Sequence, residues 1–145
     1  MKLHLSMHVE NFDEAIKFYS ALFGTEPMIV KDGYAKWDVA DPPVNFVIDQ
    51  GCCGTSAPGV DHFGIQVDSH EELETMAERI RGIDRPFLDV EATTCCYAKM
   101  EKAWVKGEAN DKWEAFLTHS HGEAEYGTDR DRLLDEETRS DQACC

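Results

Sequence analysis

The chain begins with an alternation of apolar and polar residues, which predicts a β-strand with two unlike faces. One face carries Leu3, Leu5, Met7 and Val9, and the other carries His4, Ser6 and His8. Because side chains two positions apart on a strand point the same way, the two histidines are expected on one face.

A helix is predicted next, because the apolar spacing changes to that of a helical stripe. The stripe consists of Phe12, Ala15, Ile16, Tyr19, Leu22 and Phe23. Asn11 and Glu14 form a capping box before it, and Gly24 is a typical helix end. Three short strands are expected afterwards, near residues 27–30, 34–39 and 44–48, with a turn at Asp41-Pro42-Pro43.

The same order of elements then starts again, after a segment at residues 50–59 that is typical of a linker. A strand is predicted at 61–67, followed by a capping box at Ser69 and Glu72 and a helix that ends near Gly82. Further strands are expected near residues 86–90, 95–99, 103–105 and 112–117. The sequence therefore predicts an α+β fold made of two βαβββ modules, at about residues 2–49 and 60–117, in one domain of residues 1–118.

Residues 119–145 differ from the rest of the chain, because apolar residues become rare and acidic residues accumulate. Such a segment buries too little apolar surface to offset the entropy lost on ordering. We therefore expect a flexible acidic tail, which ends in Cys144-Cys145.

Charge and composition exclude several classes of partner. The 145 residues include 29 acidic and 14 basic ones, giving a formal net charge of -15 that repels nucleic acid and anionic membrane surfaces. The chain has no long apolar run and no basic-then-apolar leader, so neither membrane insertion nor secretion is predicted. Six cysteines without secretion indicate the reducing cytoplasm.

A candidate metal site follows from the duplication. His4 and His62 occupy equivalent positions near the start of the first strand of each module. Glu114 lies on the predicted last strand between apolar neighbours, where a carboxylate is costly unless it is paired, and its counterpart in the first module is Asn45. Two imidazoles and one carboxylate would leave further metal positions open, as in non-haem Fe(II) oxygenases.

Other interpretations of these histidines remain open. A single histidine on a strand is more often a hydrogen-bonded structural residue than a ligand. His8 shares a face with His4 and is the alternative ligand. His119 and His121 are expected beyond the last strand, as solvated tail residues.

All six cysteines stand in adjacent pairs: Cys52-Cys53, Cys95-Cys96 and Cys144-Cys145. A disulfide between neighbours would close a strained ring, so cross-linking is a poor explanation. Zinc-type spacing, with two residues between cysteines, does not occur. Paired thiolates suit a soft metal or metalloid, whereas the simpler interpretation is reduced cysteines that happen to adjoin.

Several motifs in residues 2–117 resemble the vicinal oxygen chelate superfamily of glyoxalases, bleomycin-resistance proteins and extradiol dioxygenases, and within it the ArsI/CadI family of organoarsenical carbon-arsenic lyases and cadmium-induced proteins. The motifs are Phe18-Tyr19-Ser20, Leu22-Phe23-Gly24, Tyr34-Ala35-Lys36-Trp37, Asp41-Pro42-Pro43, the run from Asp61 to Val67, Thr94-Cys95-Cys96-Tyr97-Ala98 and Lys102-Ala103-Trp104-Val105. The double-cysteine motif in this setting is the most specific of them.

The resemblance implies a glyoxalase-like barrel and an Fe(II)-dependent enzyme that uses dioxygen to release arsenite from trivalent organoarsenicals such as methylarsenite. His4, His62 and Glu114 would hold Fe(II), which Ni, Co or Zn can displace by intrinsic affinity. Cys95 and Cys96 would bind the arsenical. Cys144 and Cys145 resemble a cysteine pair in family tails and would capture substrate on a flexible tether.

Two alternative functions and one form of assembly are also compatible with the sequence. The first is a heavy-metal resistance protein that binds cadmium or arsenite without catalysis. The second is a glyoxalase-like metalloenzyme, which would need a fourth ligand where Asn45 stands. Modules of this type complete their barrels within or between chains, so the assembly can be a homodimer. Cys52-Cys53 receives no role.

Overall fold

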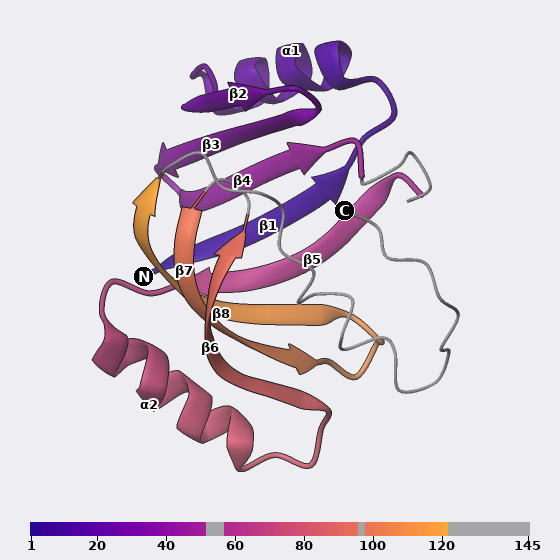
Figure 1. Ribbon diagram of the computed structural model, residues 1–145. Coiled ribbons are helices and arrows are strands. Elements are labelled where there is room, and N and C mark those ends of the chain that lie inside the picture. Colours follow the sequence, from indigo (N-terminus) through magenta and orange to yellow (C-terminus); the bar gives the residue numbers. More distant parts are fainter. Residues whose placement is uncertain (52–56, 96–97, 122–145) are drawn as a thin grey trace. The chain divides into compact units, whose positions relative to one another are not determined.

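The computed structural model describes residues 1–51, 57–95 and 98–121. Within them, eight strands and two helices follow one another in the predicted order, which confirms the α+β class and the two βαβββ modules (Figure 1). The first module contains β1 (Lys2–His8), α1 (Phe12–Phe23), β2 (Ile29–Lys31), β3 (Tyr34–Ala40) and β4 (Pro43–Asp49). The second contains β5 (Gly59–Gln66), α2 (His70–Arg81), β6 (Phe87–Cys95), β7 (Ala98–Lys106) and β8 (Lys112–His121).

The chain divides into two compact units whose boundary falls inside β5. The N-terminal unit is Lys2–Phe63, and the C-terminal unit is Gly64–Cys145 together with Met1. The first half of β5 therefore belongs to the N-terminal unit and includes His62.

The N-terminal unit is a sheet in the order β2-β3-β4-β1, continued by β5, with α1 packed on one face (Figure 1). β1 and β4 run parallel and place His4 opposite Asn45, whereas β3 is antiparallel to β4. The apolar core lies between sheet and helix. Its buried members are Ala35, Trp37, Val39, Phe46 and Ile48.

The polar face of β1 is more deeply buried than its apolar face. His4, Ser6 and His8 are buried, whereas Leu3 is 46% exposed and Leu5 and Met7 are half-buried against the core. Burial of polar groups is costly unless each is hydrogen-bonded. This face is therefore where bonded polar side chains, and a site, are expected.

The two ends of α1 follow the predicted signals. The side chain of Asn11 accepts a hydrogen bond from the backbone N–H of Glu14 at 3.3 Å. Gly24 adopts a left-handed conformation with φ of 65°, and its N–H donates to the carbonyl of Ser20. A residue with a Cβ would be strained there, so glycine ends the helix.

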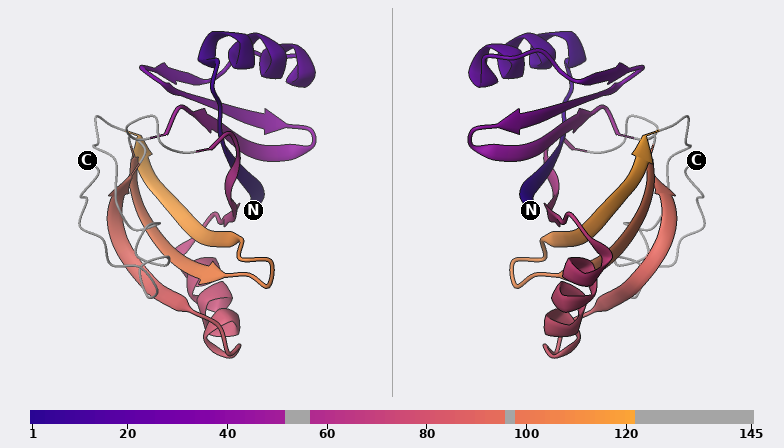
Figure 2. Two further views of the ribbon diagram at one scale, coloured as in Figure 1. Left: turned by 90° about the vertical axis from the view of Figure 1, so that its right-hand side faces the viewer. Right: turned by 90° about the vertical axis from the view of Figure 1, so that its left-hand side faces the viewer.

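In the C-terminal unit, the strand order continues from β5 through β8 and β7 to β6. α2 contacts β6 and β8 of this sheet (Figure 2). The apolar core between them contains Val67, Leu73 and Ala115, and Ala77 of α2 is also buried. α2 begins as predicted, with Ser69 accepting from the N–H of Glu72 at 3.2 Å.

The predicted strand boundaries after α2 differ from those of the structure in three places. Residues 95–99 are not a separate strand, because β6 and β7 form an antiparallel pair in which Cys95 lies opposite Ala98. The expected strand at 103–105 is the later part of β7. β8 also continues past residue 117 to His121, since it pairs with the whole of β7 as far as Ala98.

Three predicted features lie outside the described residues: the Cys52-Cys53 pair, Cys96, and the acidic tail with Cys144 and Cys145. Among the helices in the described part of the chain, neither is long and apolar enough to cross a membrane.

Candidate metal centre

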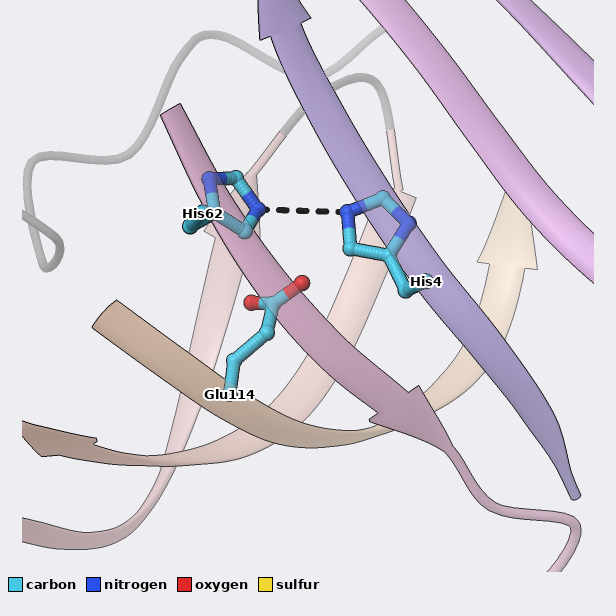
Figure 3. A group of neighbouring side chains, drawn as sticks. All are labelled: His4, His62 and Glu114. Atoms are coloured by element: carbon cyan, nitrogen blue, oxygen red, sulfur yellow. Dashed lines mark hydrogen bonds between the residues drawn. The ribbon is translucent and has the colours of Figure 1, made fainter. Parts of the chain in front are cut away.

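The two histidines that the duplication singled out meet in the N-terminal unit. Nε2 of His4 on β1 lies 3.1 Å from Nε2 of His62 on β5 (Figure 3). Both side chains are buried, with 5% and 8% of their surface exposed. Their ring planes are tilted by 45°, so the rings meet through their nitrogens rather than by stacking.

The partners of the other ring nitrogens determine where the protons lie. Nδ1 of His4 is 2.9 Å from the backbone oxygen of Asn45, and Nδ1 of His62 is 2.6 Å from Oδ2 of Asp61. A carbonyl and an ionised carboxylate only accept, so each Nδ1 carries a proton and donates it. In the neutral tautomers, both Nε2 atoms therefore direct a lone pair into the same small space.

When one ring carries a second proton, the 3.1 Å contact between the two Nε2 atoms is a hydrogen bond, and a divalent metal can take the place of that proton. A divalent metal about 2.1 Å from each Nε2 would subtend an N–metal–N angle of about 95° at their 3.1 Å separation, close to the angles of octahedral or tetrahedral coordination. The imidazoles are thus arranged as two adjacent ligands of one metal. The residues present fit a divalent cation.

His8, the alternative ligand, is engaged elsewhere in the N-terminal unit. Its Nδ1 lies 2.6 Å from Oδ1 of Asp49, and its Nε2 lies 3.3 Å from Oδ1 of Asp61. Both ring nitrogens of His8 thus contact carboxylate oxygens, so neither is available as a metal ligand in this arrangement.

Glu114 occupies a buried position in the C-terminal unit, as its apolar neighbours predicted. It lies on β8 with 5% exposed, and its Oε2 is 3.2 Å from Nζ of Lys102 on β7. Lys102 is equally buried, and its Nζ lies 5.3 Å from the ring centre of Trp104. The buried carboxylate of Glu114 is therefore paired with a buried ammonium group, and a metal ligand requires the carboxylate form.

The remaining predicted residues are distributed as follows. Cys95 ends β6, and its companion Cys96 is outside the described residues. His119 is not a tail residue: it lies on β8, exposed, with its Nε2 3.4 Å from Oε1 of Glu101. His121 is likewise not beyond the last strand: it ends β8, opposite Ala98, because β8 pairs with the whole of β7.

Sequence reasoning missed Asp61, Asp49 and Lys102, which contact the predicted ligands or their neighbours. The duplication gives a signal for Lys102, because Lys36 occupies the equivalent position in the first module. Lys36 lies opposite Val47, two residues after Asn45, and Lys102 lies opposite Phe116, two residues after Glu114. Both lysines are buried.

Comparison with curated proteins gives two informative relatives. The trivalent organoarsenical cleaving enzyme of Thermomonospora curvata is 32% identical over 144 residues, which is 99% of this chain and 87% of that protein. The cadmium-induced protein CadI of Mycobacterium tuberculosis H37Rv is 32% identical over 124 residues, 84% of this chain and 79% of CadI. No family model matches the chain.

Solved structures agree on the fold. A glyoxalase/bleomycin resistance protein/dioxygenase superfamily member from Vibrio splendidus superposes with a TM-score of 0.53 at 13% identity, covering 81% of this chain and 98% of that one. Homoprotocatechuate 2,3-dioxygenase from Arthrobacter globiformis gives a TM-score of 0.59 at 15% identity, covering 90% and 39%. The chain shares its fold with a member of the glyoxalase/bleomycin resistance protein/dioxygenase superfamily. From the identity to its relatives over most of its length, it belongs to the ArsI/CadI family.

Proposed function

We propose that this protein is an Fe(II)-dependent, dioxygen-using carbon-arsenic lyase that converts trivalent organoarsenicals such as methylarsenite to arsenite. The proposal depends most on the His4–His62 pair, whose two Nε2 atoms lie 3.1 Å apart with lone pairs directed at a common point. The substrate class is supported by the relative described as a trivalent organoarsenical cleaving enzyme, at 32% identity over 99% of the chain.

Glu114 of the C-terminal unit is the proposed third ligand. Two neutral imidazoles and one carboxylate form the donor set typical of non-haem Fe(II) oxygenases, in which the remaining coordination positions are open. Fe(II) bound there would supply the redox chemistry with dioxygen that protein side chains lack. Lys102, whose Nζ lies 3.2 Å from Oε2 of Glu114, orients the carboxylate in the buried interior.

Cys95 and Cys96 are the proposed substrate ligands. Methylarsenite has one methyl group and two hydroxyl groups on arsenic, so two thiols can replace both hydroxyls with release of two waters. The carbon substituent then stays on an arsenic that the protein holds in a fixed position, which favours reaction through orientation. Cys95 lies at the end of β6, next to the connection to β7.

Dioxygen is sufficient as the oxidant. CH3As(OH)2 and O2 together have the atoms of HCHO and As(OH)3, with the carbon-arsenic bond broken and one oxygen added to each of carbon and arsenic. Arsenic remains trivalent. The methyl carbon loses the four electrons that dioxygen gains, so no external reductant is required.

A steady-state assay tests this proposal. Metal-stripped protein is supplied with Fe(II), methylarsenite and air, and arsenite is separated from methylarsenite and quantified. Release should require both Fe(II) and dioxygen. Cys96→Ala should lose arsenic binding and keep the metal, whereas Cys52→Ala/Cys53→Ala is the matched control and should keep both; equal loss in the two variants would contradict the assignment.

Cys144 and Cys145 are proposed as a capture pair, because a tethered thiol pair raises the local concentration of arsenical. Removal of these two residues should lower the rate at low methylarsenite concentration and leave the rate at saturation unchanged. An unchanged rate at low concentration would remove this role.

The second candidate is sequestration of cadmium or arsenite without catalysis, which the relationship to CadI supports. Stoichiometric binding of the arsenical with its methyl group retained, in the presence of Fe(II) and air, would favour it. A glyoxalase-like reaction has less support, because Asn45, a neutral amide, stands where a fourth charged ligand would be needed.

A further inference from the structure

A network of buried polar side chains begins at Nδ1 of His62, the ring nitrogen that does not contact His4. Oδ2 of Asp61 is 2.6 Å from Nδ1 of His62, and Oδ1 of Asp61 is 3.3 Å from Nε2 of His8. Nδ1 of His8 is in turn 2.6 Å from Oδ1 of Asp49. All of these residues are in the N-terminal unit.

The polar residues beyond His62 are buried rather than at the surface. Less than a tenth of the side chain is exposed in Asp49, His8 and Asp61. Carboxylates with so little access to water are costly unless their oxygens are hydrogen-bonded. Each oxygen of Asp61 contacts a histidine nitrogen, and Oδ1 of Asp49 also accepts from the backbone N–H of Gly51 at 2.7 Å.

The two proposed ligand histidines therefore donate from Nδ1 to different kinds of acceptor. His4 donates from Nδ1 to a neutral backbone carbonyl, whereas His62 donates to a carboxylate. A carboxylate behind a ligating imidazole fixes its tautomer and orientation and makes its other nitrogen a stronger donor to metal. His8 contacts the other oxygen of that carboxylate through its Nε2 and so holds it in place.

We infer that Asp61 and His8 are positioning residues for the metal, and that Asp61 strengthens metal binding through His62. This inference rests on the proposed function, because it assumes that His4 and His62 hold a divalent cation. It assigns His8 a part in the site that is different from ligation. The competing explanation is that Asp61, His8 and Asp49 only stabilise the fold.

Substitutions at Asp61 separate the two explanations. Asp61→Asn keeps an oxygen that accepts from His62 Nδ1 and removes the charge, and Asp61→Ala removes both. His8→Gln removes the group that holds Oδ1 of Asp61. Asp13→Asn, on the exposed first turn of α1, removes one carboxylate from the same unit and is the matched control.

The experiment is an anaerobic titration of the full-length protein with Co(II) or Fe(II) against a competing chelator, with unfolding by urea measured on the metal-free proteins. Loss of an outer-sphere partner typically weakens metal binding by about 10–100-fold. We expect that range for Asp61→Ala, a smaller loss for Asp61→Asn and His8→Gln, and none for Asp13→Asn.

A spectroscopic measurement adds a readout that a purely structural role would not change. In the Co(II) protein, the Nδ1 proton of a ligating His62 is shifted by the unpaired electrons and, with Asp61 present, exchanges slowly with water. Asp61→Ala should make that resonance broaden or disappear, while the corresponding His4 resonance remains.

Two outcomes would overturn the inference, and only the second would also overturn the proposed metal function. If wild-type protein binds Co(II) but Asp61→Ala and His8→Gln bind it equally well, the positioning role alone is wrong. If wild-type protein binds neither Co(II) nor Fe(II) in competition with the chelator, the proposed metal function fails as well.

Discussion

Nε2 of His4 and Nε2 of His62 lie 3.1 Å apart, and Nδ1 of each ring donates to an acceptor-only group. A divalent metal between the two Nε2 atoms would be held by both imidazoles, so metal should bind the folded protein and raise its melting temperature. His62→Ala should weaken Co(II) binding by at least about 100-fold, since the cation then loses one of its few protein ligands.

The matched control for that prediction is His70→Ala, which removes an exposed imidazole from α2. Anaerobic calorimetric titration measures the affinity, and circular dichroism establishes that both variants are folded. Equal Co(II) affinity in His62→Ala and wild type would show that the metal binds elsewhere.

The buried Lys102–Glu114 pair should matter strongly for stability when one member is removed. Lys102→Ala leaves the carboxylate of Glu114, which is 5% exposed, without its 3.2 Å partner. We expect a loss of about 3–5 kcal/mol in the free energy of unfolding of the metal-free protein, measured with urea. Replacement of both, as Lys102→Met with Glu114→Leu, should cost much less.

The exposed pair of Lys17 and Glu14 on α1 is the control for that measurement. Because water and salt screen an exposed pair, Lys17→Ala should leave the free energy of unfolding nearly unchanged. Similar losses in Lys102→Ala and Lys17→Ala would contradict the burial of the Lys102–Glu114 pair.

The aromatic cluster beneath α1 predicts unequal effects for two phenylalanines. Phe46 is 3% exposed and lies 4.5 Å, centre to centre, from Tyr19, whereas Phe18 is 60% exposed. Phe46→Ala should reduce the free energy of unfolding by about 3–5 kcal/mol. Phe18→Ala should change it by less than about 0.5 kcal/mol, and comparable losses in urea titrations would contradict the placement of α1.

A pH prediction concerns His70 and Glu101, whose Nδ1 and Oε2 are 2.7 Å apart. The hydrogen bond to Glu101, and then its charge, raise the pKa of His70, while the hydrogen bond to His70 lowers the pKa of Glu101. The stabilisation is therefore complete between the ordinary pKa values of glutamate and histidine. It is lost as pH rises through the raised pKa of His70 and as pH falls through the lowered pKa of Glu101.

NMR titration of the His70 ring protons measures this coupling. Glu101→Gln should bring the pKa of His70 down toward its ordinary value. Glu78→Gln, farther along α2, should leave it near the wild-type value, and an unchanged pKa of His70 in Glu101→Gln would show that the contact does not persist in solution.

Much of the fold could be predicted from sequence because its signals are local. The caps at Asn11 and Ser69 act through backbone groups three residues away, so both helix starts were predicted correctly. The strand boundaries near Cys95 depend on pairing between β6 and β7, which a single strand's pattern does not contain. That is why the sequence predicts a separate strand at residues 95–99.

The candidate site was predictable only in part. Equivalence in the duplication was enough to bring His4 and His62 together. The roles of Asp61 and His8 depend on which oxygen meets which nitrogen, and Asp61 next to His62 looks like any surface acid in the sequence. Lys102 was missed because a lysine on a strand is normally exposed.

The central claim is tested most directly by a dioxygen pulse. Protein loaded anaerobically with Fe(II) and methylarsenite is mixed with a measured amount of dioxygen, and arsenite is quantified before and after mixing. The proposed function predicts no arsenite before the pulse and, after it, one arsenite for each dioxygen consumed. Arsenic that stays bound to the protein with its methyl group intact after the pulse would contradict it.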